Sequence, residues 1–389
     1  MNRTEWIRRF STPFLMLCLV GFSARLGYQM ARSPVLPRFA QELGATPELI
    51  GIILGASTIT GVFIKLPAGA LSDVLGRRRM LLLGAAFFAF PPFLYLFVRD
   101  PYTLLALRFL HGFATAIFSP VASAAVADLF QTGRGEKLGW FASATEVGSS
   151  LGPVAGGLLL FYGGGSFRLT YLLVGALGAA TFALALWLPV GKASPTPRSR
   201  EGSRWLSFRQ GVLDVLRNRA ILIASSVESA MFLGVGALVG FLPLYARGIG
   251  LNDAQIGVIL GGQLVTAMAG KPLSGRLSDR VGRKPMIVLG LALCAAMLPL
   301  VPVTTAFAGL LVEGVLFGLG MAIVTPSTTA LVTDLCKVGS YGSALGVFGT
   351  IWDVGEASGP ILAGLLVARV DYLATFSIVA GVLVLAGVA

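Results

Sequence analysis

The sequence contains one short segment twice, as "GALSDVLGRRRM" at residues 69–80 and as "GRLSDRVGRKPM" at residues 275–286. Asp73 in the first copy corresponds to Asp279 in the second, an offset of 206 residues (279 − 73). Because many positions agree at this one spacing, the chain is predicted to consist of two related halves. The other matching pairs are Pro37 and Pro243, Gly51 and Gly257, Gly55 and Gly261, Lys65 and Lys271, Gly112 and Gly318, Pro120 and Pro326, and Asp128 and Asp334.

Long apolar segments surround both copies of this repeat. The 389 residues are 55% hydrophobic and 12% charged, whereas soluble domains carry about 25% charged residues. Segments of roughly 20 apolar residues cross a bilayer as helices, and the alternating ten-residue pattern of barrel strands is absent. The sequence therefore predicts an all-α integral membrane protein with twelve transmembrane helices, near residues 13–38, 48–71, 79–98, 102–126, 137–161, 168–189, 220–245, 253–277, 285–303, 306–330, 341–367 and 371–389.

The loops predict the domain division and the orientation. A polar segment rich in Pro, Ser and Arg, residues 191–219, is predicted to be a cytoplasmic linker between six-helix halves at 1–190 and 220–389. Lys and Arg are concentrated in alternate loops, which places both termini in the cytoplasm of a multi-pass protein of the inner (plasma) membrane. The net charge of +12 is scattered over short loops, so we expect no nucleic-acid partner. The basic N-terminus is predicted to begin an uncleaved first helix.

The repeated segment resembles the signature of the major facilitator superfamily, G-x-L-a-D-r-x-G-r-k-x-x-l, with Val74 in place of a basic residue. This resemblance implies the major facilitator fold, in which two halves rock about a central site. It also implies a conformational latch in which Asp73 pairs with arginines and a helix N-terminus while the cytoplasmic side is closed. Alternatively, the arginines only anchor the orientation. The latch residues would be Gly69, Asp73, Gly76, Arg77, Arg78, Asp279, Gly282 and Arg283.

The segment "EVGSSLGPVAGG" at residues 146–157 resembles the fifth-helix motif of the drug/proton antiporter group, g-x-x-x-G-P-x-x-G-G. Proline bends a helix, and the glycines allow close helix packing at the bend. The resemblance implies an exporter, and a purely structural kink is the alternative. The matching residues are Gly148, Gly152, Pro153, Gly156 and Gly157.

Two polar stripes are predicted to face the central cavity. The first predicted helix carries Arg25, Tyr28, Gln29 and Arg32 at the spacing i, i+3, i+4 and i+7, on one helical face. The segment "LLALRFLHGFATA" at 104–116 resembles the family's fourth-helix motif and carries Arg108 and His111. An arginine keeps its proton, so these arginines would hold a carboxylate ionised or bind an anion. His111 is either a neutral hydrogen-bonded residue or a substrate-binding one.

Five carboxylates also lie within predicted spans, where an unpaired charge costs several kcal/mol, so such residues normally face a cavity. We expect three of them, Glu228, Glu313 and Asp353, to be the leading candidates for proton coupling. Lys65 and Lys271 are expected to extend toward the cytoplasmic surface. Alternatively, they pair with the acids inside a cavity, as the near balance of basic and acidic residues in the spans suggests. The full set of carboxylates is Glu146, Glu228, Glu313, Asp353 and Glu356.

These patterns together favour a secondary active transporter that exports a small amphipathic solute or drug in exchange for protons by alternating access. A proton-linked importer or facilitator of an anionic metabolite is one alternative, and a non-transporting receptor or scaffold is another. No nucleotide loop, zinc constellation or nucleophile–base arrangement indicates an enzyme. Neither a cofactor nor a metal is expected, since the three cysteines show no metal-ligand spacing. The expected partners are the lipid bilayer, a small-molecule substrate and protons, and the chain is expected to be a monomer.

Overall fold

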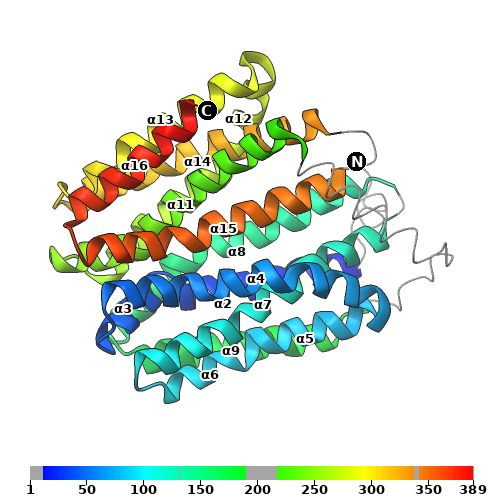
Figure 1. Ribbon diagram of the computed structural model, residues 1–389. Coiled ribbons are helices and arrows are strands. Elements are labelled where there is room, and N and C mark those ends of the chain that lie inside the picture. The colour runs from blue at the N-terminus through cyan, green and yellow to red at the C-terminus, as the bar shows by residue number, and fades with distance from the viewer. Residues whose placement is uncertain (1–11, 131, 190–216, 337–340, 389) are drawn as a thin grey trace.

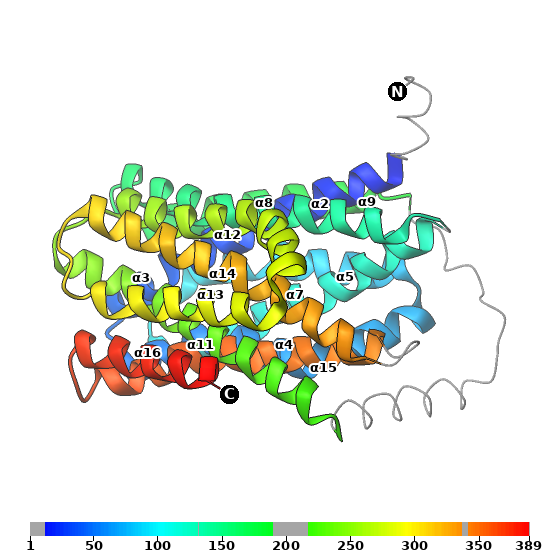
Figure 2. The ribbon, with the colours of Figure 1, turned by 90° about the horizontal axis from the view of Figure 1, so that it is seen from above.

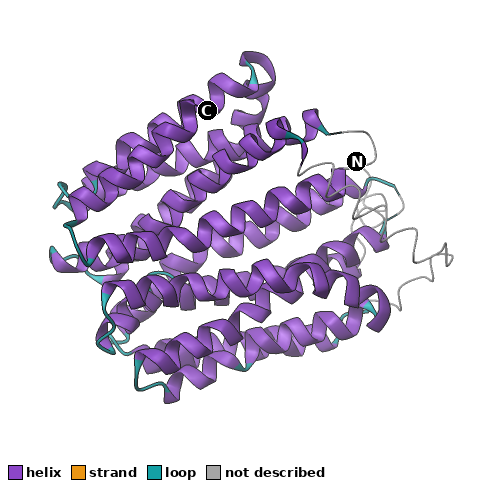
Figure 3. Cartoon of the chain, viewed as in Figure 1, coloured by secondary structure: helices purple, strands orange, loops and turns teal. Residues whose placement is uncertain are grey.

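The computed structural model describes residues 12–130, 132–189, 217–336 and 341–388, and the regular structure in these ranges is helical (Figure 3). The first part contains α2 (Thr12–Arg32), α3 (Val35–Glu42), α4 (Pro47–Leu75), α5 (Arg77–Ala89), α6 (Pro91–Leu94), η1 (Tyr95–Phe97), α7 (Pro101–Leu129), α8 (Arg134–Tyr162) and α9 (Phe167–Leu186). The second part contains α11 (Arg219–Gly248), α12 (Asp253–Val281), α13 (Arg283–Met297), η2 (Leu298–Leu300), α14 (Phe307–Leu335), α15 (Tyr341–Val367) and α16 (Tyr372–Val388).

The number of membrane spans agrees with the sequence-based prediction of twelve. In the described ranges, nine helical spans are long and apolar enough to cross a membrane, judged by length and composition. The long helices α8 and α15 and the shorter α16 complete the twelve. The predicted boundaries are too short mainly at one end, where α4, α7, α12 and α14 continue three to five residues further. Hydropathy falls there before the helix ends, because the last helical turns contain polar residues.

The helices are bounded by residues that satisfy the free backbone groups at their ends. At the start of α12, the Asn252 side chain accepts from the Gln255 N–H, and the Gln255 side chain accepts from the Asn252 N–H, a capping box. At the other end of α4 and α12, Gly76 and Gly282 have φ values of 93° and 106°. These positive angles suit glycine, which explains a glycine at this point in both copies of the repeat.

We call residues 12–189 the N-half and residues 217–388 the C-half. The end of the bundle that contains Gly76 and Gly282 is called the basic end, and the opposite end, with the turns at 43–46 and 249–252, is called the far end. The basic end lies at the right of Figure 1 and the far end at the left. The predicted linker, 191–219, lies outside the described residues except for 217–219.

Two helix pairs make the largest contacts between the halves. In the N-half α4 packs against α15 of the C-half, and α8 packs against α12 (Figures 1 and 2). Glycines allow close approach at both crossings. A Cβ added to Gly157 would lie 2.9 Å from the Cα of Gly257, and one added to Gly51 would lie 3.0 Å from the carbonyl carbon of Pro360. Both crossings are near the far end, so the halves are in tight backbone contact there.

Within each half, glycines serve a second helix contact. A Cβ on Gly156 of α8 would lie 2.6 Å from the Met30 carbonyl oxygen of α2, and Gly148 and Gly152 face the same helix. In the C-half, a Cβ added to Gly355 of α15 would lie even closer to the Ser229 carbonyl oxygen of α11. The glycines of the α8 motif therefore pack α8 onto α2, and Gly157 alone among them faces the other half.

Candidate functional site

A cavity with two adjoining compartments lies between the halves. The central compartment has a volume of about 340 Å³ and lies between α2, α4 and α8 of the N-half and α11, α12, α14 and α15 of the C-half. The basic-end compartment has a volume of about 720 Å³ and lies between α2, α4, α7, α8 and α15. Arg25, Arg32, Trp352 and Glu356 line both compartments, which join them into one site.

The cavity extends toward the basic end and is closed at the far end. Ser123, Leu138 and Leu345 line the basic-end compartment within two helical turns of the basic ends of α7, α8 and α15. At the far end, Arg38 of α3 makes an ion pair with Asp253 at the start of α12. This ion pair and the two glycine crossings separate the cavity from the far end.

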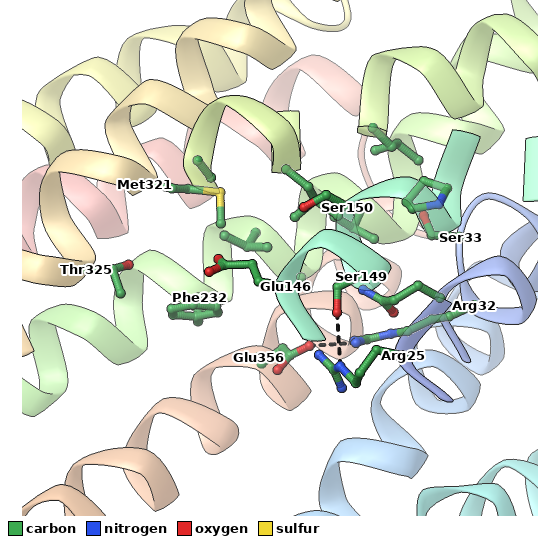
Figure 4. A pocket seen from close by; sticks show the side chains of 18 of the residues that line it. Arg25, Arg32, Ser33, Glu146, Ser149, Ser150, Phe232, Met321, Thr325 and Glu356 are labelled. Carbon is green, nitrogen blue, oxygen red and sulfur yellow. Dashed lines mark hydrogen bonds and ion pairs between the residues drawn. The ribbon is translucent and has the colours of Figure 1, made fainter. Parts of the chain in front are cut away.

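Three ion pairs cross between the halves at the cavity. Arg32 Nη1 lies 2.7 Å from Glu356 Oε1. The Lys65 ammonium lies 2.5 Å from Asp353 Oδ2, and Lys271 makes an ion pair with Glu146. Figure 4 shows the Arg32–Glu356 pair beside the central compartment.

Two of these pairs are reciprocal. Lys65 and Lys271 occupy equivalent positions in the two halves, and so do Glu146 and Asp353, with one residue of difference in spacing. The lysine of each half thus binds the carboxylate of the other. The two lysines are therefore paired inside the cavity, which is the alternative to their expected extension toward the cytoplasmic surface, because each has a carboxylate of the facing half within reach.

Arg25 is held differently from its neighbour Arg32. Its Nε donates to Ser149 Oγ at 3.0 Å, and Ser149 Oγ in turn donates to the Thr145 carbonyl oxygen at 3.1 Å. Within the described ranges, Arg25 makes no ion pair with a carboxylate. Figure 4 shows the Arg25 side chain next to Ser149 and beside the Arg32–Glu356 pair. Of the predicted first-helix stripe, Arg25 and Arg32 line both compartments, Gln29 the central one and Tyr28 the basic-end one.

Arg108 and His111 line neither compartment, contrary to the expectation from the sequence. Arg108 is fully buried inside the N-half, where it donates to Ser57 Oγ at 2.6 Å and to the Tyr95 hydroxyl at 3.4 Å. His111 Nδ1 lies 3.2 Å from the same hydroxyl. The ring of Tyr28 is edge-on to His111 and 5.7 Å from the Arg108 guanidinium. The stripe on α7 therefore faces the hydroxyl groups inside its own half.

Glu228 and Glu313 also lie off the cavity, which corrects a second expectation. Glu228 is fully buried and accepts from Thr328 Oγ1 at 2.6 Å. Glu313 accepts from Thr304 Oγ1 at 2.5 Å. In the part of the chain that the structure describes, the second oxygen of each carboxylate has no hydrogen-bond partner. Of the five carboxylates, Glu146, Asp353 and Glu356 line the cavity.

The predicted latch residues make ion pairs inside their own halves. Arg77 Nη2 lies 2.5 Å from Asp73 Oδ1, and Arg77 Nε lies 2.9 Å from Asp128 Oδ2 of α7. Arg283 repeats this geometry in the C-half with Asp279 and Asp334, at 2.5 and 3.2 Å. Arg78 donates to the Leu186 carbonyl oxygen at 3.0 Å, which ties α5 to α9. Gly69 has open space around it. Among the described residues, these arginines therefore do not connect the halves in this conformation.

The sequence-based reasoning missed the apolar wall of the site. The rings of Phe232 and Trp352 have centroids 4.4 Å apart and line the central compartment with Met321. Ser149 was missed as well, and the two lysines were named without their partners. The repeat offered one usable signal, because Lys65, Lys271, Glu146 and Asp353 form a set of equivalent basic and acidic positions.

The fold and the site define a multi-pass membrane transporter of small molecules, in which twelve helices surround a charged cavity between two halves. The pattern of the Major Facilitator Superfamily matches residues 17–252 and 225–389, so the chain belongs to this family of secondary transporters and is not an enzyme. The match confirms the family that the repeated segment indicated.

Several known proteins are similar over nearly the whole chain. An uncharacterised transporter of the same family from Methanocaldococcus jannaschii is 26% identical, with 97% of this chain and 95% of the relative covered. The multidrug resistance protein MdtG of Salmonella heidelberg is 25% identical, covering 97% and 93%. Among solved structures, the nucleoside transporter NupG has a TM-score of 0.79 at 15% identity, covering 97% and 98%. A bacterial homologue of the human lysosomal transporter Spinster has a TM-score of 0.80 at 15% identity, covering 97% and 95%. These two likenesses confirm the fold.

Proposed function

We propose that this transporter exports a small amphipathic organic solute in exchange for protons, with its basic end and both termini in the cytoplasm. The loops rich in Lys and Arg favour this orientation. The Gly-Pro motif of α8 and the similarity to the multidrug resistance protein MdtG favour export. In this orientation the described conformation presents the cavity to the cytoplasm, where an exporter takes up its substrate.

The observation that carries the proposal is the pair of reciprocal ion pairs, Lys65 with Asp353 and Lys271 with Glu146. A carboxylate that has bound a proton is neutral and no longer attracts the ammonium group of its lysine. Proton binding therefore competes with an attraction that holds the two halves together beside the cavity. Two events that compete in this way are linked, and such linkage is what alternating access needs in order to couple proton and solute movement.

The proposal assigns the protons to Asp353 and Glu146, which line the cavity and pair across the halves. Asp353 is one of the three residues favoured by the sequence. Glu228 and Glu313, the other two, line neither compartment and bond to threonines of their own half. A proton on either of them would leave the contacts between the halves unchanged, so we assign them no part in coupling.

The test is solute flux in proteoliposomes with and without an imposed pH gradient. Suitable probes share one aromatic body: 2-naphthalenesulfonate, the neutral 2-naphthalenesulfonamide and the cationic (2-naphthylmethyl)trimethylammonium. When the gradient is imposed, we expect faster movement of the solute in the direction opposite to the downhill movement of protons. Asp353→Asn and Glu146→Gln should each keep solute exchange but lose the response to the gradient. Asp371→Asn, at the exposed far-end start of α16, is the matched control and should keep both.

A wild-type flux that is unchanged when the gradient is collapsed contradicts proton coupling. The direction of coupling separates the second candidate function, import of an anionic metabolite. Arg25 favours this function, since it has no carboxylate partner among the described residues. A proton-linked importer would move the solute and protons in the same direction, so its flux would rise with a gradient of the opposite sign.

A further inference from the structure

We infer that the solute is an organic anion, with one oxyanion group bound by Arg25 and an apolar body that lies against Phe232, Trp352 and Met321. This inference rests on the proposed function insofar as the cavity between the halves is the transport site. A carboxylate, a sulfonate and a phosphonate each provide such an oxyanion group.

The charges that line the cavity leave a surplus of one cation. Of the residues that the structure describes, four basic side chains and three carboxylates line the two compartments. Each carboxylate is paired with one base, and the bases that are used in this way are Arg32, Lys65 and Lys271. The remaining base is Arg25, which has a hydroxyl group as its partner within the described ranges. The cavity is therefore electrostatically complementary to a single negative charge.

The contacts of Arg25 orient its guanidinium group for such a ligand. Ser149 Oγ accepts a hydrogen bond from Arg25 Nε and donates its own proton to the Thr145 carbonyl oxygen. In the described part of the chain, the two terminal nitrogens of Arg25 have no hydrogen-bond partner. A guanidinium group donates two parallel hydrogen bonds to an oxyanion through such an edge. The side chain is thus held in place without its binding edge being occupied.

The remaining walls of the central compartment suit an apolar body. Phe232 and Trp352 form a tilted aromatic pair, and Met321 of α14 lines the same space. The volume of about 340 Å³ is within the range of about 300–1,000 Å³ that is typical of small-molecule sites. Figure 4 shows Phe232 and Met321 on one side of this space and Arg25 with Ser149 on the other. A molecule with an aromatic or aliphatic body and one acidic group can contact both sides.

A cationic solute fits the same cavity less well. Each of the three carboxylates that line it already binds a lysine or arginine, so a cation would have to displace one of these side chains. An anion would need no such displacement, because Arg25 makes no ion pair with a carboxylate in the part of the chain that the structure describes. Burying a charge without a partner costs several kcal/mol, which makes this difference decisive.

Calorimetric binding to the purified full-length protein at one fixed pH tests this inference. The probes are 2-naphthalenesulfonate, 2-naphthalenesulfonamide and (2-naphthylmethyl)trimethylammonium, which differ in the charge of one group. We expect the sulfonate to bind about 10- to 100-fold more tightly than the other two, since a hydrogen-bonded charge contributes about 1.5–3 kcal/mol. Such binding does not require a gradient, so its result is independent of the flux test of proton-coupled export.

Three variants locate the site of the anion. Arg25→Gln should weaken binding of the sulfonate about tenfold or more and leave that of the sulfonamide unchanged. Arg25→Lys should restore part of the affinity for the sulfonate, which a purely structural role of Arg25 would not predict. Arg168→Gln, at the exposed far-end start of α9, removes an equal charge outside the cavity and should change nothing. The melting temperature of each variant shows whether it is folded.

Two results would overturn the inference. One is a wild-type protein that binds the trimethylammonium probe at least as tightly as the sulfonate. The other is a folded Arg25→Gln variant with unchanged affinity for the sulfonate. If either result were found together with gradient-dependent flux, the proposed export function would stand and the substrate class would be wrong.

Discussion

The N-half and the C-half carry equivalent charged residues where they meet, but their interiors hold charges of opposite sign. The interface contains a lysine and a carboxylate from each half in reciprocal pairs. Inside the N-half, Arg108 is buried among hydroxyl groups, whereas Glu228 is buried beside Thr328 inside the C-half. The position equivalent to Arg108 is Gly314, and the position equivalent to Glu228 is Phe22. The reciprocal lysine–carboxylate pairs between the halves are thus duplicated, whereas the buried charges Arg108 and Glu228 each occur in one half only.

The largest effect is expected from filling the glycine crossing of α8 and α12. Gly257→Val would place carbon atoms against the backbone of Pro153 and Gly157. Overpacking of this kind costs about 3 kcal/mol, a factor of ~100 in the equilibrium constant for closing the far end. We expect solute flux in proteoliposomes to fall by up to this factor. Gly381→Val, on an open face of α16, is the control and should transport normally.

Gly51→Val tests whether the two crossings are equivalent, because it fills the α4–α15 contact in the same way. A loss of flux similar to that of Gly257→Val would support the comparison. Normal flux in Gly51→Val would show that one crossing alone closes the far end.

A smaller effect is expected from removing the lysines of the reciprocal pairs. Lys65→Met leaves Asp353, whose side chain is 8% exposed, without its partner. Because the Lys65 side chain is 40% exposed and the pair is only partly buried, this should lower the free energy of unfolding by about 2 kcal/mol at pH 8. Lys271→Met leaves Glu146, whose side chain is 34% exposed, and should cost about 1 kcal/mol. Denaturant unfolding of the purified proteins measures both differences.

Asp353→Asn in the Lys65→Met background removes the unpaired charge and should recover most of the loss. If both lysine variants lost the same stability, burial would not distinguish the two pairs and the halves would be more symmetric than the structure indicates.

The smallest effect concerns the first turn of α7 and of its counterpart α14. Asp100 caps α7, and its equivalent at the start of α14 is Ala306, which makes no side-chain cap. The hydroxyl and backbone N–H of Thr103, and the N–H of Tyr102, lower the pKa of Asp100 below the ordinary 3.8. The stabilisation from ionised Asp100 is thus present above pH 3.8 and lost as the pH falls through this lower pKa.

Melting curves between pH 2 and pH 7 measure this contribution, because this range includes the protonation of Asp100. Asp100→Asn should keep the cap but lose the pH-dependent part. Ala306→Asp should add about 1 kcal/mol of stability near neutral pH and lose it in acid. An Ala306→Asp protein no more stable than wild type would mean that the start of α14 is not open to capping.

Much of the fold follows from the sequence because bilayer thickness fixes helix length and the repeat fixes the pairing of the halves. The twelve spans were found from apolar runs alone. The positive φ values of Gly76 and Gly282 explain why these glycines recur in both copies. The helix ends were less well predicted, because hydropathy reports where the membrane ends and not where hydrogen bonding stops.

The side-chain partners in the site could not be predicted in the same way. Helical spacing places Arg108 and His111 on one face, but a helix in a bundle has more than one face that contacts protein. Periodicity does not say which face borders the cavity. Lys65 and Asp353 are 288 residues apart in the sequence, so their contact depends on how the two halves dock. The charged stripes therefore predicted correctly that α2 presents its arginines to the cavity, and wrongly that α7 presents Arg108 to it.

The reciprocal ion pairs have a consequence for the ancestry of the chain. Each pair joins a lysine on the second span of one half to a carboxylate on the fifth span of the other. A six-helix protein with one such lysine and one such carboxylate would form both pairs at once on assembling as a two-fold dimer. Fusion of two copies into one gene would then preserve a contact that a single sequence had already provided.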